Sequence, residues 1–312
     1  MIKKNLQIIF LPVIFLVFML GNSIAQVTDW DIAWQAYEAG NYEKAVRYYS
    51  NYIRDYPRSE SAYYNRGLSY YELKDYYKAS DDFQQATRLE RQNPQAYYYI
   101  GLCNYKLGYY DDAIKYYDVA IEQDNTFGNA YFEKAHAYYY LKSYDKSLEY
   151  YDLAFTYLAA DDRYLVYNNR AVVYIDLKQY DKAIDECDKG IAVKSNFAKL
   201  YWNRGKAYYY KDQYETAIKE FDKAILYEPS YATPYYNRGS CYYMLGQYST
   251  ALIDLNKAID LYDQDADYYV TRGVVYTKLG ESANAIKDFN TALQLNPDLE
   301  NQIKELIKDA SK

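Results

Sequence analysis

Small side chains recur through this chain at a fixed interval. They fall 34 residues apart, except for one step of 36 residues between Ala135 and Ala171. Twelve residues after each comes a second small residue, four further on a bulkier one, and three beyond that another small one. The recurring small residues are Gly67, Gly101, Ala135, Ala171, Gly205, Gly239 and Gly273. Such a period predicts an array of similar small units, each of which buries its apolar face against its neighbours.

The pattern of small and bulky residues within each unit predicts two helices. The small residues fall where two helix backbones must approach closely, and the bulkier residues fill the space between them. A helix often ends at a glycine in the left-handed conformation, so glycines between the two runs mark turns. Four units carry such a glycine: Gly40, Gly108, Gly246 and Gly280.

The pattern resembles the tetratricopeptide repeat family over residues 26–297. Eight copies are in register, beginning near residues 26, 60, 94, 128, 164, 198, 232 and 266. The resemblance implies an all-α fold, a right-handed α-solenoid of eight helix-turn-helix units with a concave groove. Residues 298–312 predict one more helix that caps the array, with Asp298 as its N-cap and Leu299, Ile303, Leu306 and Ile307 on its apolar face.

Arginine departs from the family pattern at the seventh repeat position, where the family often has leucine. It stands there in five units: Arg66, Arg170, Arg204, Arg238 and Arg272. Four aspartates on second helices are candidate partners: Asp82, Asp222, Asp254 and Asp288. We interpret these residues as a structural ladder across the helix packing, since stacked repeats place equivalent residues in rows. A ligand-binding role for the arginines is the alternative.

The N-terminal stretch predicts an export signal and no part of the fold. Lys3 and Lys4 precede a short apolar run, and Ser23-Ile24-Ala25 has the small-x-small pattern that a signal peptidase cleaves. We therefore expect residues 1–25 to be a signal peptide and the protein to be periplasmic or secreted. The apolar run is too short to span a bilayer comfortably, so no membrane span is expected after cleavage. A signal that is retained as an anchor is the alternative.

Charge and histidine content bear on several classes of function. After cleavage the chain carries 34 Lys and Arg against 43 Asp and Glu, a balance that repels a phosphate backbone, so we expect no nucleic-acid partner. His136 is the chain's one histidine, which argues against Ser-His and Cys-His nucleophiles and against multi-histidine metal sites. No phosphate loop or dinucleotide fingerprint is found. We expect no catalytic residue, no metal site and no cofactor; a carboxylate enzyme using Glu72 and Asp176 is the weakest alternative.

Two further sequence features could be mistaken for functional sites, a calcium-loop-like spacing of aspartates and the three cysteines. Asp263, Asp265 and Asp267 are spaced like the start of a calcium loop, but Tyr268 stands where that loop needs glycine. We expect aspartate here to cap the next helix. The cysteines show no pairing pattern, and Cys103 and Cys241 occupy equivalent places four repeats apart, so we expect buried thiols and no disulfide.

Tyrosine is the most abundant functional candidate, with 48 copies in 312 residues. In the family that the chain resembles, the fifth, ninth and twelfth repeat positions line the groove that grips peptides or partner helices. Aromatic side chains and one histidine occupy many of these positions: Trp30, Trp34, Tyr64, Tyr71, Tyr98, Tyr105, Phe132, His136, Tyr139, Trp202, Tyr209, Tyr236 and Tyr243. By that resemblance we expect a scaffold that binds a protein or peptide in this groove, in a cell-envelope assembly. A cell-wall or surface glycan stacked on the aromatic rows is the alternative, and ordinary packing between helices remains open for any single tyrosine.

Overall fold

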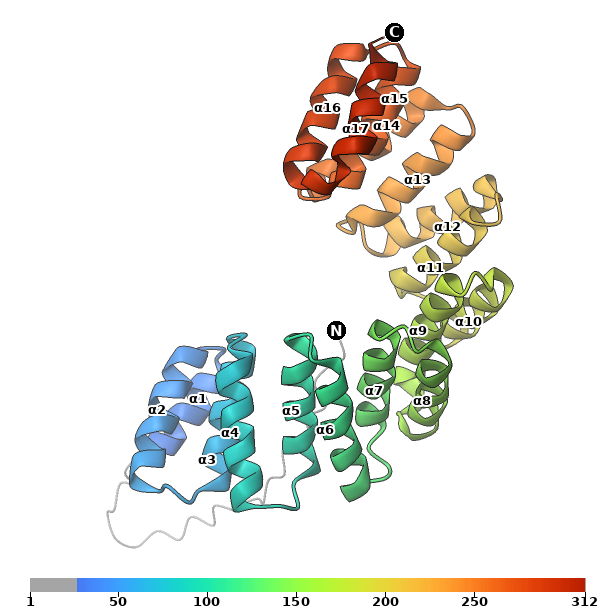
Figure 1. Cartoon of the computed structure of the whole chain (residues 1–312). Helices are drawn as coiled ribbons and strands as arrows, with labels where there is room; N and C mark the ends of the chain where they lie inside the picture. Colours follow the sequence, from blue (N-terminus) through green and yellow to red (C-terminus); the bar gives the residue numbers. More distant parts are fainter. Residues whose placement is uncertain (1–26, 312) are drawn as a thin grey trace, which may run out of the picture. The chain divides into compact units, whose positions relative to one another are not determined.

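The computed structural model describes residues 27–311, so the predicted signal peptide lies outside the described residues. The described part contains seventeen α-helices and two short 3₁₀ helices, with no strand between Val27 and Ser311 (Figure 1). The prediction of an all-α fold built from helix-turn-helix repeats is confirmed. The helices form two compact units that divide after Leu158.

The N-terminal unit contains four helical hairpins. Helices that follow one another pack together, and each second helix also packs on the first helix of the next hairpin. The helices are α1 (Asp29–Glu38), α2 (Tyr42–Asp55), α3 (Glu60–Glu72), α4 (Tyr76–Leu89), α5 (Pro94–Lys106), α6 (Tyr110–Gln123), α7 (Gly128–Tyr140) and α8 (Tyr144–Tyr157).

The C-terminal unit contains four more hairpins and a final helix. A 3₁₀ turn, η1 (Ala160–Asp162), precedes its first helix and contains the two-residue surplus of the fourth repeat. The helices are α9 (Arg163–Asp176), α10 (Tyr180–Val193), α11 (Ala198–Tyr209), α12 (Tyr214–Tyr227), α13 (Ala232–Met244), α14 (Tyr248–Leu261), α15 (Ala266–Lys278), α16 (Ser282–Leu295) and α17 (Glu300–Ala310).

The turn inside each hairpin has one left-handed residue. Gly40 is an example, with φ at 74°, and its amide donates to the Tyr37 carbonyl while Asn41 donates to the Ala36 carbonyl. These two bonds satisfy carbonyls at the helix end. The four glycines predicted for such turns all have positive φ. In the other four hairpins the same place is taken by Lys74, Lys142, Lys178 and Asp212.

Close helix approach explains the small residues of the repeat. A Cβ atom on Gly101 would lie 2.4 Å from the Tyr117 ring, and one on Gly273 would lie 2.5 Å from the Phe289 ring. The ring of the second helix thus lies directly on the backbone of the first. Ala79, Ala113 and the equivalent alanines of the other second helices are fully buried.

The predicted arginine ladder is confirmed. Arg66 donates from Nε and Nη2 to both carboxylate oxygens of Asp82, at 2.7 Å each. Arg238 binds Asp254 in the same bidentate manner, and its Nη1 also reaches Asp222 of the preceding repeat. Such charge-assisted pairs fix the geometry of two helices at once. The acids of two further rungs are glutamates, which the aspartate pattern missed: Glu186 beside Arg170 and Glu220 beside Arg204.

Two repeats replace the ion pair by an apolar one. Ile32 and Ile100 stand where the arginines would be, and Tyr48 and Tyr116 stand where the acids would be. In these two repeats the arginine and the acid are exchanged together. The fourth repeat has a third arrangement, in which Lys134 lies 3.8 Å from the Tyr150 ring centroid and pairs with Asp118 of the preceding repeat.

The C-terminal helix begins two residues later than predicted, because Pro297–Leu299 first forms a 3₁₀ turn. The prediction that Asp298 is the N-cap is wrong. The Asn296 side chain accepts from the Asp298 amide, and Leu299 occupies the N-cap position of α17 without a side-chain bond. The apolar face does pack as expected, since Ile303 is 1 % exposed against a cluster that contains Phe289.

Candidate partner-binding surface

The thirteen residues predicted to line a groove all lie on first helices of hairpins. Nine belong to α1, α3, α5 and α7 of the N-terminal unit, and four belong to α11 and α13 of the C-terminal unit. Twelve of them are half-buried, so each presents part of its side chain to solvent. Phe132 differs, because it is only 4 % exposed and has almost no surface for a partner.

The fifth-position rings pack on the bulky residue of their own second helix. In the N-terminal unit the ring centroids lie between 5.4 and 5.9 Å apart in the pairs Trp30–Tyr49, Tyr64–Phe83, Tyr98–Tyr117 and Phe132–Tyr151. This burial raises the pKa of Tyr64 and Tyr98 well above the usual value, so both phenols are neutral at physiological pH. A neutral phenol can donate as well as accept a hydrogen bond.

The twelfth-position tyrosines pack on the first residue of the second helix. The pair Tyr105–Tyr110 is typical, with centroids 5.5 Å apart in an edge-on arrangement. The same contact recurs in six hairpins: Tyr37–Tyr42, Tyr71–Tyr76, Tyr105–Tyr110, Tyr139–Tyr144, Tyr209–Tyr214 and Tyr243–Tyr248. These tyrosines therefore hold the turn of the hairpin as well as contributing to the surface.

In the C-terminal unit the surface has polar bridges between neighbouring first helices. The Trp202 indole donates to the Asn237 side chain at 2.7 Å, and Asn203 donates to Asn168 at 3.0 Å. The Lys206 ammonium lies 4.8 Å from the Trp202 ring centroid. Burial lowers the pKa of Lys206, while the nearby Asp176 carboxylate acts in the opposite direction.

In the N-terminal unit the carboxylate of Glu133 lies among aromatic rings of the surface. Glu133, on α7, is 16 % exposed in its side chain, and its Oε2 lies 3.3 Å from His136 Nδ1. The stacked pair Tyr105–His136 lies against it, with centroids 6.3 Å apart. We call Glu133, His136, Tyr98, Tyr105 and Tyr117 the Glu133 cluster. The sequence analysis missed Glu133, although its position is asparagine in four other repeats.

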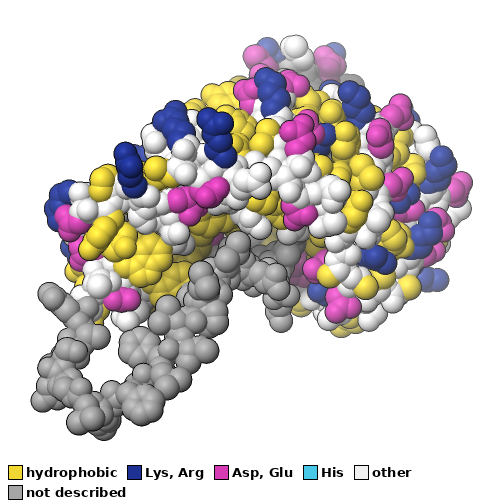
Figure 2. All heavy atoms as spheres, turned by 90° about the horizontal axis from the view of Figure 1, so that it is seen from below, with side chains coloured by type: hydrophobic (Ala, Val, Ile, Leu, Met, Phe, Trp, Pro, Cys, Tyr) yellow, Lys and Arg dark blue, Asp and Glu magenta, His cyan; other side chains and the backbone are white. Residues whose placement is uncertain are grey.

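The surface as a whole mixes hydrophobic and charged side chains. Figure 2 shows one face on which hydrophobic side chains, tyrosine included, come to the surface between Lys, Arg, Asp and Glu. No α-helix within residues 27–311 is both long and apolar enough to cross a bilayer.

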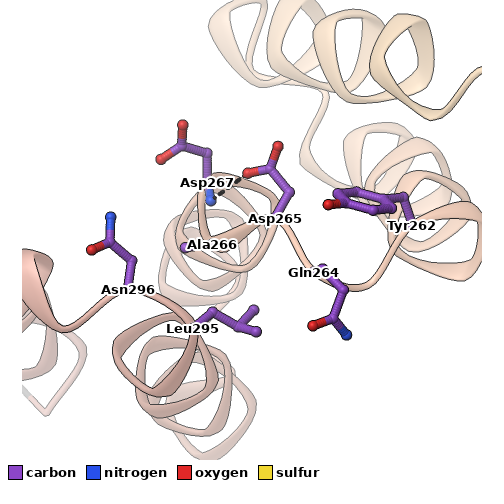
Figure 3. A pocket seen from close by; sticks show the side chains of 7 residues that line it. All are labelled: Tyr262, Gln264, Asp265, Ala266, Asp267, Leu295 and Asn296. Carbon is purple, nitrogen blue, oxygen red and sulfur yellow. Dashed lines mark hydrogen bonds between the residues drawn. The ribbon is translucent and has the colours of Figure 1, made fainter. Parts of the chain in front are cut away.

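The calcium-like aspartates have a structural role. Asp265 caps α15, and its Oδ1 accepts from the Asp267 amide at 2.9 Å (Figure 3). The two aspartates line an open hollow at the end of α16 together with Tyr262, Gln264, Ala266, Leu295 and Asn296. Their side chains do not converge on one point, and no group of three potential metal ligands is found among the described residues.

The three cysteines are free and buried, as expected. Burial raises the pKa of the Cys103 thiol and of the Cys241 thiol to about 12. Both thiols are therefore protonated and unreactive at physiological pH.

Solved structures of low sequence identity share this fold. The crystal structure of the APC/C hetero-tetramer Cut9–Hcn1 matches with a TM-score of 0.67 and 20% identity, over 87% of this chain and 53% of that chain, so the present chain spans about half its length. A tetratricopeptide repeat protein from Parabacteroides merdae matches with a TM-score of 0.64 and 22% identity, over 81% and 99% of the two chains. PilF of Pseudomonas aeruginosa matches with a TM-score of 0.58 and 16% identity, over 67% of this chain and 94% of that chain. No curated protein matches the chain.

Family profiles match along most of the repeat array. The profile described as anaphase-promoting complex, cyclosome, subunit 3 matches residues 38–120. Profiles described as tetratricopeptide or TPR repeats match residues 128–157, 164–197, 205–246, 232–265 and 266–299. These repeat profiles together cover just over half of the chain, and the chain belongs to the tetratricopeptide repeat family.

Proposed function

We propose that this protein is a non-catalytic scaffold that binds a protein partner, through an extended peptide segment, on the aromatic surface of its first helices. The observation that carries the proposal is the row of half-buried aromatic side chains at the fifth and twelfth repeat positions. Apart from the buried Phe132, these rings pack against neighbouring rings and are still partly exposed. A surface of this kind loses little side-chain entropy on binding.

The solved structure of an APC/C hetero-tetramer supports an assembly role, since the protein that resembles this chain is found there in a complex. We further propose that the assembly belongs to the cell envelope. This part rests on the signal-like residues 1–25, which predict export.

Affinity capture from envelope extract tests the proposal. The full chain is compared with two single variants, Tyr105→Ala in the N-terminal unit and Tyr243→Ala in the C-terminal unit. Matched controls change exposed residues of second helices, Gln85→Ala and Ile253→Ala. Circular dichroism verifies that each variant retains its helices.

We expect a stoichiometric protein partner that is captured by the wild type and by both controls. Loss of at least tenfold in capture by one or both tyrosine variants is expected, as is usual for central aromatic contacts. Equal capture by every variant would contradict binding on the first helices. Binding of soluble cell-wall fragments with no protein partner would favour the glycan alternative.

A further inference from the structure

Glu133 stands at a position that carries a charge in only one other repeat, at Asp31 of the first. The sixth repeat position is asparagine in four repeats, at Asn65, Asn169, Asn203 and Asn237. In the C-terminal unit these asparagines bond to neighbouring first helices, as Asn237 does to Trp202. A carboxylate with 16 % exposure at this position lacks most of its solvation, so it needs compensation from a cation or from hydrogen-bond donors.

The surroundings of Glu133 are aromatic. Burial is the largest cause of the raised pKa of five tyrosines, and the negative charge of Glu133 raises their pKa further. These are Tyr71, Tyr98, Tyr105, Tyr117 and Tyr151. Among the described residues, the polar group within hydrogen-bond reach of its carboxylate is the His136 imidazole, whose Nδ1 lies 3.3 Å from Oε2. No Lys or Arg of the described residues forms an ion pair with Glu133.

Two tyrosine hydroxyls add polarity where packing does not need it. The equivalent second-helix position is phenylalanine in three repeats, at Phe83, Phe221 and Phe289. It is tyrosine in three repeats, at Tyr117 and Tyr151 beside Glu133 and at Tyr49 in the first repeat. Tyr117 is fully buried, and its hydroxyl has no hydrogen-bond partner among the described residues. Hydroxyl dipoles and ring faces next to a carboxylate form an environment that favours a cation.

The chain already places ammonium groups against rings of this surface. Lys206 lies 4.8 Å from the Trp202 ring centroid in the C-terminal unit, with Asp176 nearby. Lys206 occupies the ninth repeat position, which is His136 in the repeat of Glu133. Lys106 lies 5.7 Å from the Tyr105 ring centroid but is largely exposed. The Glu133 cluster thus has the aromatic and acidic parts of such a site without a cation paired to its carboxylate.

We propose that the Glu133 cluster binds the cationic side chain of a lysine or arginine in the partner segment, with the cation against the Tyr98 and Tyr105 rings and paired to the Glu133 carboxylate. This inference rests on the proposed function, because the cation arrives on a bound peptide. The charge of the unit agrees with it: residues 27–158 contain 20 Asp and Glu against 14 Lys and Arg. A basic segment is therefore attracted to this unit before it docks.

Selection of peptides from a random 12-residue display library tests the inference on the full mature chain. The wild type is compared with Glu133→Gln, which keeps the side-chain shape and removes the charge. Glu149→Gln, on the exposed side of α8, is the matched control. The tightest peptide from the wild type is then synthesised with each of its Lys or Arg residues replaced by norleucine, and all affinities are measured by titration.

We expect Lys or Arg to be enriched at one position in peptides selected by the wild type and by Glu149→Gln, and not by Glu133→Gln. Replacing that residue by norleucine should weaken binding to the wild type about tenfold or more and leave binding to Glu133→Gln unchanged. Selected peptides without a basic preference, or with the same preference in Glu133→Gln, would overturn the cation site and leave the proposed function standing. No selected peptide at all would contradict the proposed function as well. If the protein binds free spermidine and no peptide, the ligand of the Glu133 cluster is a small polyamine and not a peptide side chain.

Discussion

At the scale of single residues, the ladder between the helices of a hairpin is the most informative feature. Arginine at the seventh position always has an acid sixteen residues later, as in Arg272 and Asp288. Where isoleucine replaces arginine, tyrosine replaces the acid, as in Ile100 and Tyr116. A buried carboxylate without its partner is strongly unfavourable, whereas an apolar pair of similar volume fills the same space. The two pairs should therefore be interchangeable only as pairs.

Exchange of one rung tests this account. Arg238→Ile leaves Asp254, which is 4 % exposed, without its bidentate partner, and should lower the free energy of unfolding by about 3 kcal/mol. The double variant Arg238→Ile with Asp254→Tyr reproduces the pair found in the third repeat and should recover to within about 1 kcal/mol of the wild type. Urea denaturation measures both values. A double variant no more stable than the single one would contradict the exchange rule.

At the scale of the helix and its turn, a left-handed residue closes every hairpin. A non-glycine residue in this conformation costs about 1 kcal/mol because its Cβ crowds the backbone. Four hairpins avoid this cost with glycine, and four do not. The hydrogen bonds of the turn are the same in both sets, as Lys142 and Gly246 show by donating to Tyr139 and Tyr243.

Reciprocal substitution in these turns should give effects of opposite sign. Lys142→Gly should raise the free energy of unfolding by about 1 kcal/mol, and Gly246→Lys should lower it by a similar amount. Both positions are exposed, so few packing contacts change. Thermal melts of the two variants beside the wild type measure the effect. A stabilised Gly246→Lys would show that backbone strain does not control these turns.

The final helix is an element whose contribution comes from packing alone. Ile303 is 1 % exposed in the cluster with Phe289 and Ala292. Ile303→Ala should lower the stability of the last hairpin by about 3 kcal/mol, because it leaves a cavity. Lys304→Ala, on the exposed side of the same helix, should change it by less than about 0.5 kcal/mol. Hydrogen exchange of α16 amides is the measurement, and equal exchange in the two variants would show that α17 does not act as a cap.

At the scale of the whole molecule, the many buried phenols make stability depend on alkaline pH. Burial raises the pKa of Tyr99 to about 12 and that of several other tyrosines further. The folded state therefore holds its phenolic protons more tightly than the unfolded state. The contribution of the phenols to stability is fully present below the ordinary tyrosine pKa of about 10 and is lost as pH rises from there through the folded pKa values.

This linkage predicts alkaline unfolding. The free energy of unfolding should begin to fall near pH 8.5, where the Cys103 and Cys241 thiols ionise in the unfolded chain, and should fall more steeply above about pH 10, where the phenols do. Tyrosinate absorbance should rise in two phases. The exposed tyrosines ionise first, and the buried tyrosines ionise later, in the same transition in which the helical signal is lost. Titration of all tyrosines in one step near pH 10, with the helices intact, would contradict the burial of the rings.

The repeat made most of the fold predictable from the sequence. The small residues, the turn glycines and the arginine ladder follow from local spacing, and each was predicted from equivalent positions. The Asp298 cap was mispredicted because a 3₁₀ turn after Pro297 places that residue inside the turn and not before the helix. The sequence analysis missed Glu133 because a single acidic residue on a helix is usually exposed to solvent, and nothing in the sequence distinguishes Glu133 from such a residue. Only the packing of α5 to α8 shows that rings surround it.

Site-specific photo-crosslinking in cells tests the central claim, that the first helices bind the partner, most directly. A photoreactive phenylalanine analogue replaces Tyr105 and Tyr243 on first helices, and Gln85 and Ile253 on exposed sides of second helices. We predict that one partner protein is crosslinked from a first-helix position and from neither second-helix position. Crosslinks from Gln85 or Ile253 alone would contradict the claim and would place the binding surface on the second helices.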